Sequence, residues 1–323
     1  MRVSLVIPCF NEEDNIIPFF ELCEERFKEW KYEIEYIFVN DGSRDTTFLK
    51  IKELIRERQK KTIVGLNFSR NFGKEAAMFA GLSKCKGDFV TVIDADLQQD
   101  PKYVVQMVEF LEKNVEYDCV ACYQKKRKES KVLIFLKKIF YKMINSISDT
   151  HFEENASDFR TFRKNMVNSI LELKEYYRFS KGIFSWVGFQ VYYMPYAVKE
   201  RAHGETTWSI KKLTRYAIEG FVGFSTAPLK IATWIGILSS TLSILYFLYV
   251  LVEKLVKGIN ISGYATIVSL ILLIGGVQMI LLGIMGEYLA RTYIEVKDRP
   301  IYLLKEIVES KAEDNINHER IVQ

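Results

Sequence analysis

Short apolar runs alternate with amphipathic segments along the first 123 residues of the chain. Each apolar run predicts a strand, and each segment with apolar residues at helical spacing and a polar face predicts a helix. This alternation is typical of βαβ units, so it predicts an α/β fold with a doubly wound, mostly parallel sheet. The strands are expected at about 3–8, 34–39, 62–67, 88–93 and 117–123, and the helices at about 14–28, 45–58, 72–85 and 101–113.

Two much longer apolar runs follow, at residues 231–252 and 264–286, and neither contains a charged residue. As helices they would be about 33–35 Å long, which is enough to cross the ~30 Å hydrocarbon layer of a membrane. Small residues such as Gly236 and Ser240 provide faces for close packing of the two helices or of neighbouring subunits. The runs predict a transmembrane hairpin; the alternative is a pair of helices buried in a soluble core.

The hairpin divides the chain into four predicted regions. A domain at 1–208 is followed by an amphipathic interfacial helix at 209–226, the hairpin at 227–290, and a polar tail at 291–323 that begins as a helix end. A second interfacial helix is expected after the basic run at 124–128, because apolar residues alternate there with lysines that would face anionic lipid.

The basic residues near the hairpin predict its orientation. The positive-inside rule places the more basic flanks of a span in the cytoplasm. We therefore expect a multi-pass protein of the inner (plasma) membrane, with the large domain and both termini in the cytoplasm. Four basic residues precede the first span and three follow the second, whereas the connecting loop has two: Lys211, Lys212, Arg215 and Lys230; Arg291, Lys297 and Arg299; Lys254 and Lys257.

Composition narrows the functional classes. A net charge of +4 and the lack of a recognisable motif argue against nucleic-acid binding. The N-terminal run is short and acidic residues follow at once, so it does not resemble a signal peptide. Five cysteines favour buried, reduced thiols. Cys119 and Cys122 would point to opposite faces of one strand, which argues against a redox or zinc pair.

Polar residues follow four of the predicted strands, at 11–13, 40–43, 69–74 and 94–100. In open parallel sheets, ligands bind at the carboxyl ends of the strands, so these groups are expected to converge on one site. The first strand is not followed by G-x-G-x-x-G, and no G-x-x-x-x-G-K-[ST] occurs, so neither a dinucleotide fingerprint nor a P-loop is supported.

The last of these segments, DFVTVIDADLQQD at 88–100, predicts a metal site. Carboxylates of Asp94 and Asp96 close together repel each other unless a cation neutralises them. With the Gln98 amide they form a set of hard oxygen ligands that suits Mg²⁺ or Mn²⁺, and such ions are usually completed by substrate phosphates. The alternative is an Asp-rich turn, including Asp100, that caps the next helix.

Eight segments, in this order and spacing, resemble the family 2 glycosyltransferases, and among them the polyprenyl-phosphate glycosyltransferases. This subgroup includes dolichyl-phosphate mannose synthase and the bactoprenol glucosyltransferases, and the paired spans resemble the latter. The resemblance covers about residues 1–300 and implies a GT-A fold. The segments are VIPCFNEEDNI, VNDGSRDTT, NFSRNFGKEAAMFAGL, VTVIDADLQQDP, ASDFRTFRK, FSKGIFSWVGF, ERAHGETTWS and FSTAPLK.

The resemblance implies roles for the strand-end residues. Asp94 would face ribose and diphosphate and also belongs to the metal set, whereas Asp96, with Gln98, would bind the ion that bridges the diphosphate. Asn40 stands where many relatives have a second aspartate, which leaves the expected role on Asp41. The implied base and ribose pocket consists of Pro8, Asn11, Glu12, Asp41 and Ser43.

The remaining implied roles concern sugar and phosphate. Asp158 matches a proposed catalytic base, although it could instead position the sugar or a basic side chain; the alternative is a surface salt-bridge cluster with Arg160 and Arg163. Arg201 matches a mobile-loop arginine near both phosphates, and Arg127 an acceptor-phosphate ligand. Arg70 and Lys74 are expected at phosphate or sugar, with a solvated helix face as the alternative for Lys74.

Together these features predict a membrane glycosyltransferase of the cell envelope. It would transfer a hexose, with glucose from UDP-glucose favoured, to undecaprenyl phosphate with inversion. The alternatives are mannose or a modified aminoarabinose as the sugar, a non-polyprenyl acceptor, or a non-enzymatic nucleotide-sugar sensor. The hairpin's resemblance to its relatives implies a homo-oligomer, with a tetramer expected.

Overall fold

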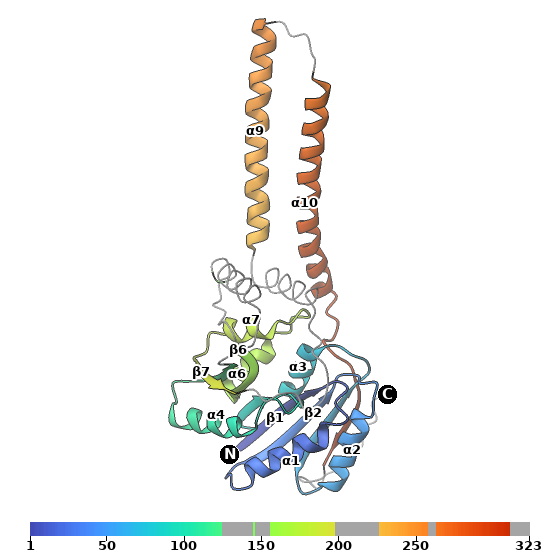
Figure 1. The fold of residues 1–323 in the computed structure, drawn as a ribbon, viewed down its shortest axis with the longest axis vertical. Helices are drawn as coiled ribbons and strands as arrows, with labels where there is room; N and C mark the ends of the chain where they lie inside the picture. The colour runs from blue at the N-terminus through green and yellow to red at the C-terminus, as the bar shows by residue number, and fades with distance from the viewer. Residues whose placement is uncertain (125–144, 146–155, 198–225, 258–262, 311–323) are drawn as a thin grey trace.

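The computed structural model describes residues 1–124, 145, 156–197, 226–257 and 263–310, and Figure 1 shows their arrangement. An α/β domain contains the N-terminal half of the chain. Two long helices, α9 (Ala227–Lys257) and α10 (Tyr264–Val296), extend side by side away from that domain.

The centre of the domain is an eight-stranded sheet of order β7-β5-β6-β4-β1-β2-β3-β8. Strands β4, β1, β2 and β3 are parallel, whereas β6 pairs antiparallel with both β4 and β5. The predicted mixed, mostly parallel sheet is therefore confirmed. The strands are β1 (Arg2–Cys9), β2 (Glu33–Asn40), β3 (Thr62–Phe68), β4 (Phe89–Val92), β5 (Cys119–Gln124), β6 (Ala156–Arg163), β7 (Val191–Tyr196) and β8 (Leu304–Glu309).

Helices cover both faces of the sheet, so two apolar cores form. Alternate residues of β1 divide between them: Val3 and Leu5 belong to the core beneath α1 and α4, and Val6 belongs to the core beneath α3. Helix α3 lies so close to the sheet that a Cβ at Gly81 would be 2.2 Å from Cγ1 of Val6. The helices are α1 (Ile16–Phe27), α2 (Thr47–Glu57), α3 (Lys74–Lys84), α4 (Lys102–Lys113), α6 (Lys164–Glu172) and α7 (Ser180–Trp186).

The five cysteines are buried free thiols, as predicted. Cys119 packs in the core beneath α3 and Cys122 in the core beneath α1 and α4, so the two point to opposite faces of β5. Burial raises the pKa of both thiols to about 12, which keeps them protonated and unreactive at neutral pH.

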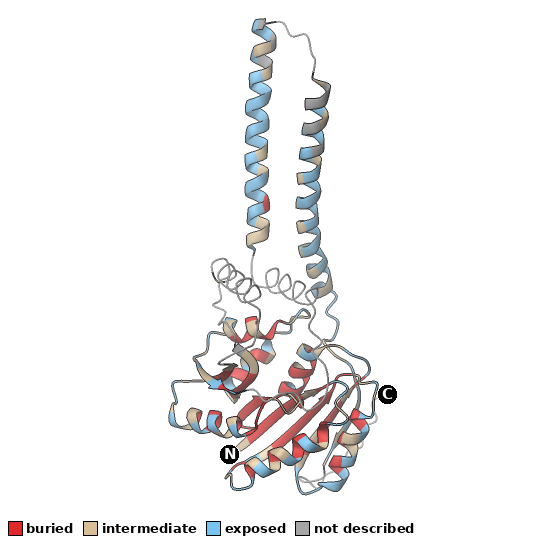
Figure 2. Ribbon diagram, in the orientation of Figure 1, coloured by how far each residue is buried: buried red, intermediate tan, exposed pale blue. Residues whose placement is uncertain are grey.

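The two long helices keep their apolar side chains exposed, as Figure 2 shows. Both are long and apolar enough to cross a membrane by length and composition, and most of their described residues are exposed, although Ala232 of α9 is buried. The alternative of helices buried in a soluble core is therefore wrong. Helix α10 ends at Val296, beyond the predicted end of the span, because polar residues continue it with an i,i+4 ion pair between Glu287 and Arg291 at 3.3 Å.

The predicted polar tail needs a correction. After α10 the chain returns to the domain, and β8 pairs antiparallel with β3 at the edge of the sheet. Leu303 O accepts a hydrogen bond from Ser69 N at 2.9 Å, and the ring of Tyr302 stacks on Phe68 with 5.0 Å between centroids. The open edge of β3 supplies backbone hydrogen-bond partners for this six-residue strand, which has three apolar and three charged residues.

Candidate active site

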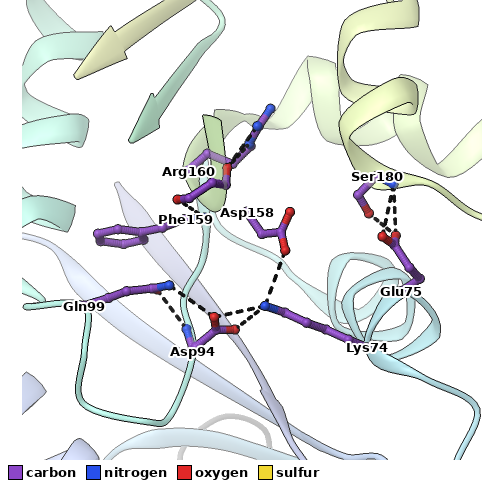
Figure 3. Close-up of polar contacts among 9 residues, drawn as sticks. Lys74, Glu75, Asp94, Gln99, Asp158, Phe159, Arg160 and Ser180 are labelled. Carbon is purple, nitrogen blue, oxygen red and sulfur yellow. Dashed lines mark hydrogen bonds and ion pairs between the residues drawn. The ribbon is translucent and has the colours of Figure 1, made fainter. Parts of the chain in front are cut away.

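Asp94 follows β4 and is held from two sides (Figure 3). Nζ of Lys74 lies 2.7 Å and 2.9 Å from the two carboxylate oxygens. Gln99 donates through Nε2 to Asp94 Oδ2 at 3.1 Å and accepts from the Asp94 backbone N at 3.0 Å. The turn between them is tight, because Leu97 adopts a φ of +61°. The geometry therefore fixes the orientation of this carboxylate.

Lys74 also reaches Asp158 of β6, with 3.4 Å between Nζ and Oδ2. Burial lowers the pKa of Lys74, but the charges of Asp94 and Asp158 outweigh it and raise the pKa overall. Burial raises the pKa of Asp158, yet Lys74, then Lys181 and Arg160, lower it overall. Asp158 therefore stays ionised at neutral pH, and the Lys74 side chain is part of a charged cluster rather than a solvated helix face.

The ends of β1 and β2 meet through backbone and side-chain hydrogen bonds. Asn11, with a φ of +56°, donates from its backbone N to Ser43 Oγ at 2.9 Å and accepts from Arg44 N at 2.9 Å. Glu12 N donates to Thr47 Oγ1 at 2.8 Å. Pro8 lies beside Val39 near the ends of the same two strands. The structure thus brings the predicted base and ribose residues of these strands together.

Asp41 is buried and binds the chain that leads into α3. Its carboxylate accepts from Phe72 N at 2.6 Å, Gly73 N at 2.9 Å and Asn71 Nδ2 at 2.9 Å. Burial raises the pKa of Asp41, and the two backbone hydrogen bonds oppose that shift. Asp41 therefore positions the loop that presents Lys74, while its contact with a nucleotide stays a prediction.

Three arginines have distinct surroundings. Arg70 stacks on Phe72, with 4.4 Å from the guanidinium to the ring centroid. Arg160 is buried over Phe184 at 4.6 Å, and Arg163 donates to the carbonyls of Leu111 and Tyr117. Arg160 and Arg163 therefore support α7 and the end of α4, so the surface salt-bridge cluster suggested for them is wrong.

The donor set at the end of β4 fits a divalent cation only with substrate oxygens added. Asp96 Oδ1 accepts from Gln98 N at 3.1 Å in a local turn. Within the described ranges, no group of three His, Cys, Asp or Glu side chains could hold a metal alone. Hard oxygens from two carboxylates and an amide, completed by a diphosphate, suit Mg²⁺ or Mn²⁺. Asp94 is held by Lys74 and Gln99, whereas Asp96 and Gln98 lie in the turn that follows it.

Asp100 has the role that the alternative interpretation predicts, in which the Asp-rich turn caps the next helix. Its Oδ1 accepts from Lys102 N at 3.1 Å at the start of α4 and pairs with Arg26 at 3.2 Å. This carboxylate stabilises the helix start, and its place in the sequence motif does not make it part of the site.

Two residues at the site were missed by sequence reasoning. The sequence pattern favoured Gln98, the residue before Gln99. The only sequence signal for Gln99 was that it is the second of two consecutive glutamines. Glu75, beside Lys74, binds Ser180 of α7; its partner lies 105 residues away, and no sequence pattern links them. Arg127, Arg201 and the two interfacial helices, at 209–225 and after the basic run, lie outside the described residues, so their predicted roles stay predictions.

Comparison with known proteins places this geometry in a family. The model of "Glycosyl transferase family 2" matches residues 4–171, which contain every strand end described above. The chain belongs to that family. The model of the "GtrB C-terminal hairpin" matches residues 227–292, which include α9 and most of α10. The protein is therefore a glycosyltransferase with a GT-A-type sheet and a C-terminal helical hairpin of the GtrB type.

Relatives match along nearly the whole chain. The bactoprenol glucosyl transferase of Shigella phage SfII is 40% identical, over 94% of this chain and 98% of the relative. The putative glycosyltransferase CsbB of Bacillus subtilis is 40% identical, over 94% and 91%. A glucosyl-3-phosphoglycerate synthase from Mycobacterium tuberculosis, solved with Mn²⁺ and UDP-glucose, is 16% identical with a TM-score of 0.45, over 68% of this chain and 77% of that one.

Proposed function

We propose that this glycosyltransferase transfers glucose from UDP-glucose to the phosphate of undecaprenyl phosphate, with inversion at the anomeric carbon. The observation that carries the proposal is the combination of a charged cluster at the end of β4 with a hairpin of the GtrB type. The bactoprenol glucosyl transferases at about 40% identity over nearly the full length support the choice of sugar and lipid.

The proposed step needs no deprotonation of the acceptor. An oxygen of the lipid phosphate attacks the anomeric carbon, the bond from that carbon to the diphosphate breaks, and UDP leaves with the bonding electrons. A phosphate monoester is already ionised at neutral pH. Asp158 is a weak base because its pKa is lowered overall, so its suggested role is to hold Lys74 and the sugar. Arg127 and Arg201 are proposed to bind phosphate, because guanidinium groups make bidentate contacts with it.

The residues proposed to hold a divalent cation are Asp96 and Gln98, with Asp94 oriented by Lys74 towards ribose and diphosphate. A bound cation would offset the negative charge of the departing nucleoside diphosphate. Pro8, Asn11, Glu12, Asp41 and Ser43 are proposed to surround or support the base and ribose at the ends of β1 and β2.

We also propose that the domain and both termini are cytoplasmic. The basic flanks of the hairpin favour this orientation. The pairing of β8 with β3 supports one part of this proposal, that the chain after α10 lies on the same side as the domain, because β8 follows α10.

The direct test uses the full-length protein in detergent with undecaprenyl phosphate, Mg²⁺ or Mn²⁺, and labelled UDP-glucose. We expect an organic-soluble product that mild acid hydrolyses, because a sugar phosphate on a prenol is acid-labile. A panel containing GDP-mannose and an aminoarabinose donor tests the sugar, and diacylglycerol tests the acceptor. Lack of transfer from every donor would contradict the proposal.

Two variants separate the roles within the site. Asp96→Ala should abolish transfer while the protein remains folded, and full activity would remove the metal assignment. Asp158→Asn distinguishes a base from a positioning role: loss of a general base lowers the rate about 10²- to 10⁴-fold, whereas a positioning role predicts a smaller loss.

A further inference from the structure

Glu75, the second residue of α3, joins this helix to α7. Its carboxylate accepts hydrogen bonds from the backbone N of Ser180 at 3.1 Å and 3.2 Å and from Ser180 Oγ. Ser180 is buried and is the first residue of α7. The contact therefore links the two helices through residues that are 105 positions apart in the chain.

Lys74 and Glu75 hold opposite sides of the same site. Figure 3 shows Lys74 directed towards Asp94 and Asp158, whereas Glu75 is directed towards Ser180. The first turn of α3 is therefore connected to the end of β4, to β6 and to α7 through two consecutive side chains.

Helix α7 in turn supports the strand that carries Asp158. The ring of Phe184 lies 5.0 Å from that of Phe162 in β6, and the guanidinium of Arg160 lies 4.6 Å above Phe184. A displacement of α7 would therefore be transmitted to Arg160 and Phe162, which follow Asp158 on β6, because close-packed side chains leave little room for independent movement.

Residues 173–180, which we call the strap, connect this arrangement with the hairpin. Tyr176 N donates to Glu295 of α10 at 3.0 Å. The guanidinium of Arg178 lies 4.3 Å over Phe79 of α3, and the strap ends at Ser180. The end of α10 and the first turn of α3 thus contact the same short segment, at Tyr176 and at Ser180.

The charges around Glu75 come from every element packed against it. Lys74 is its neighbour on α3, Asp158 is on β6, and Arg178 is on the strap, where Glu175 also acts on Arg178. Burial and then Asp158 raise the pKa of Glu75 to about 7, against the hydrogen bonds from Ser180 and the charge of Arg178. Its protonation therefore changes near neutral pH.

We propose that Glu75 is a positioning residue of the transfer reaction, which holds α7 and β6 so that Lys74 stays between Asp94 and Asp158. The inference rests on the proposed function, because it concerns the geometry in which transfer occurs. Glu75 itself touches neither substrate; it acts through Ser180 and through the helix that it shares with Lys74.

Glu75→Ala removes both acceptors for Ser180, so we expect kcat to fall at least tenfold. The dissociation constant for UDP, measured by calorimetry, should change less than threefold, because the ends of β1 and β2 do not depend on α7. Glu172→Ala, at an exposed glutamate of α6, is the matched control and should leave both values unchanged. A kcat within twofold of the wild-type value, or a loss of UDP binding as large as the loss of kcat, would overturn the inference.

Glu75→Gln separates positioning from a merely structural contribution. The amide keeps the size and can still bond Ser180, but it cannot titrate. We expect it to restore most of the activity lost in Glu75→Ala. A protonated Glu75 can accept the same hydrogen bond as the amide, so the pH profiles of the wild type and the glutamine variant should differ little near pH 7, where Glu75 titrates. A kcat of the glutamine variant as low as that of Glu75→Ala would contradict the role of Glu75.

Hydrogen–deuterium exchange tests the contact without any activity. In full-length Glu75→Ala, peptides covering residues 176–187 should exchange at least fivefold faster than in the wild type, while peptides from α1 should not change. If the wild type transfers no sugar, the proposed function fails alone. If exchange of residues 176–187 is unchanged, or is faster with kcat unaffected, the positioning inference fails alone.

Discussion

At the scale of single residues, the site depends on one ammonium group, that of Lys74, which two carboxylates share. The ammonium of Lys74 lies 2.7 Å from Asp94 and 3.4 Å from Asp158, yet its side chain is 42% exposed. A partly solvated ion pair of this kind contributes little to stability. Its effect is to orient two acidic groups that would otherwise repel each other and any incoming diphosphate.

Lys74→Met should therefore reduce activity more than stability. We expect at least a tenfold loss of kcat/KM and a small change in Tm. Without the lysine, the pKa of Asp158 should rise, so the decline of activity on the acid side should move to higher pH. Activity measured from pH 5 to pH 9, with Lys84→Met at the far end of α3 as control, checks both expectations.

Individual residues also show which parts of the site could be predicted from the sequence and which could not. The carboxylates after β4 and the lysine at the start of α3 were found because their spacing carries a chemical pattern. Glu75 and Gln99 were missed because their importance comes from partners, Ser180 and Asp94, that only the folded chain supplies. Asp41 was found, but its hydrogen bonds to Phe72 N and Gly73 N show a loop-positioning role that its motif did not predict.

At the scale of elements, loops between strands and helices determine how the site is shaped. Gly42 has a φ of +62°, and a Cβ there would lie 2.3 Å from the backbone carbon of Arg70. The loops after β2 and β3 therefore touch backbone to backbone. This approach places Asp41 within reach of the chain entering α3.

Gly42→Ala should separate these two loops. We expect a loss of stability of about 2 kcal/mol or more, because strain at a positive φ adds to a clash with backbone atoms. Gly73→Ala is the matched control: its φ is +99°, but a Cβ there meets no atom within 4 Å. A larger fall in Tm and in UDP affinity for Gly42→Ala than for Gly73→Ala would identify the close approach as the cause.

The segment that leads into β8 should stabilise the sheet through the aromatic contact of Tyr302. Tyr302 stacks on Phe68 and lies 6.4 Å from the ring of Phe79. We expect Tyr302→Ala to lower Tm and to cost about 2 kcal/mol, since aromatic burial and stacking are both lost. Leu303→Ala, whose side chain is 52% exposed, should have little effect on Tm in the same measurement.

The elements themselves were largely predictable. The strands and helices of the first 113 residues appear within about two residues of their expected bounds, because apolar periodicity reports directly on burial. Strand β8 was not predictable, because a polar edge strand has half of its surface in solvent and takes its partner from a strand more than 230 residues earlier.

At the scale of the whole molecule, the proposed orientation in the membrane can be tested by labelling introduced cysteines. All five native cysteines are buried, so they provide a low background for labelling. We expect Asn260→Cys, in the loop between the predicted spans, to react with a membrane-impermeant maleimide on intact cells. Lys61→Cys, on the domain, should react only after the cells are opened. The reverse pattern would contradict the proposed orientation.

The return of β8 to the sheet also has a consequence for how the protein is made. Strand β3 emerges from the ribosome early, but its antiparallel neighbour follows both long helices. Until then one edge of the sheet is open to pairing with other chains. If α9 and α10 cross the membrane, the soluble domain reaches its complete form only after insertion, so membrane integration becomes a step in the folding of the enzyme.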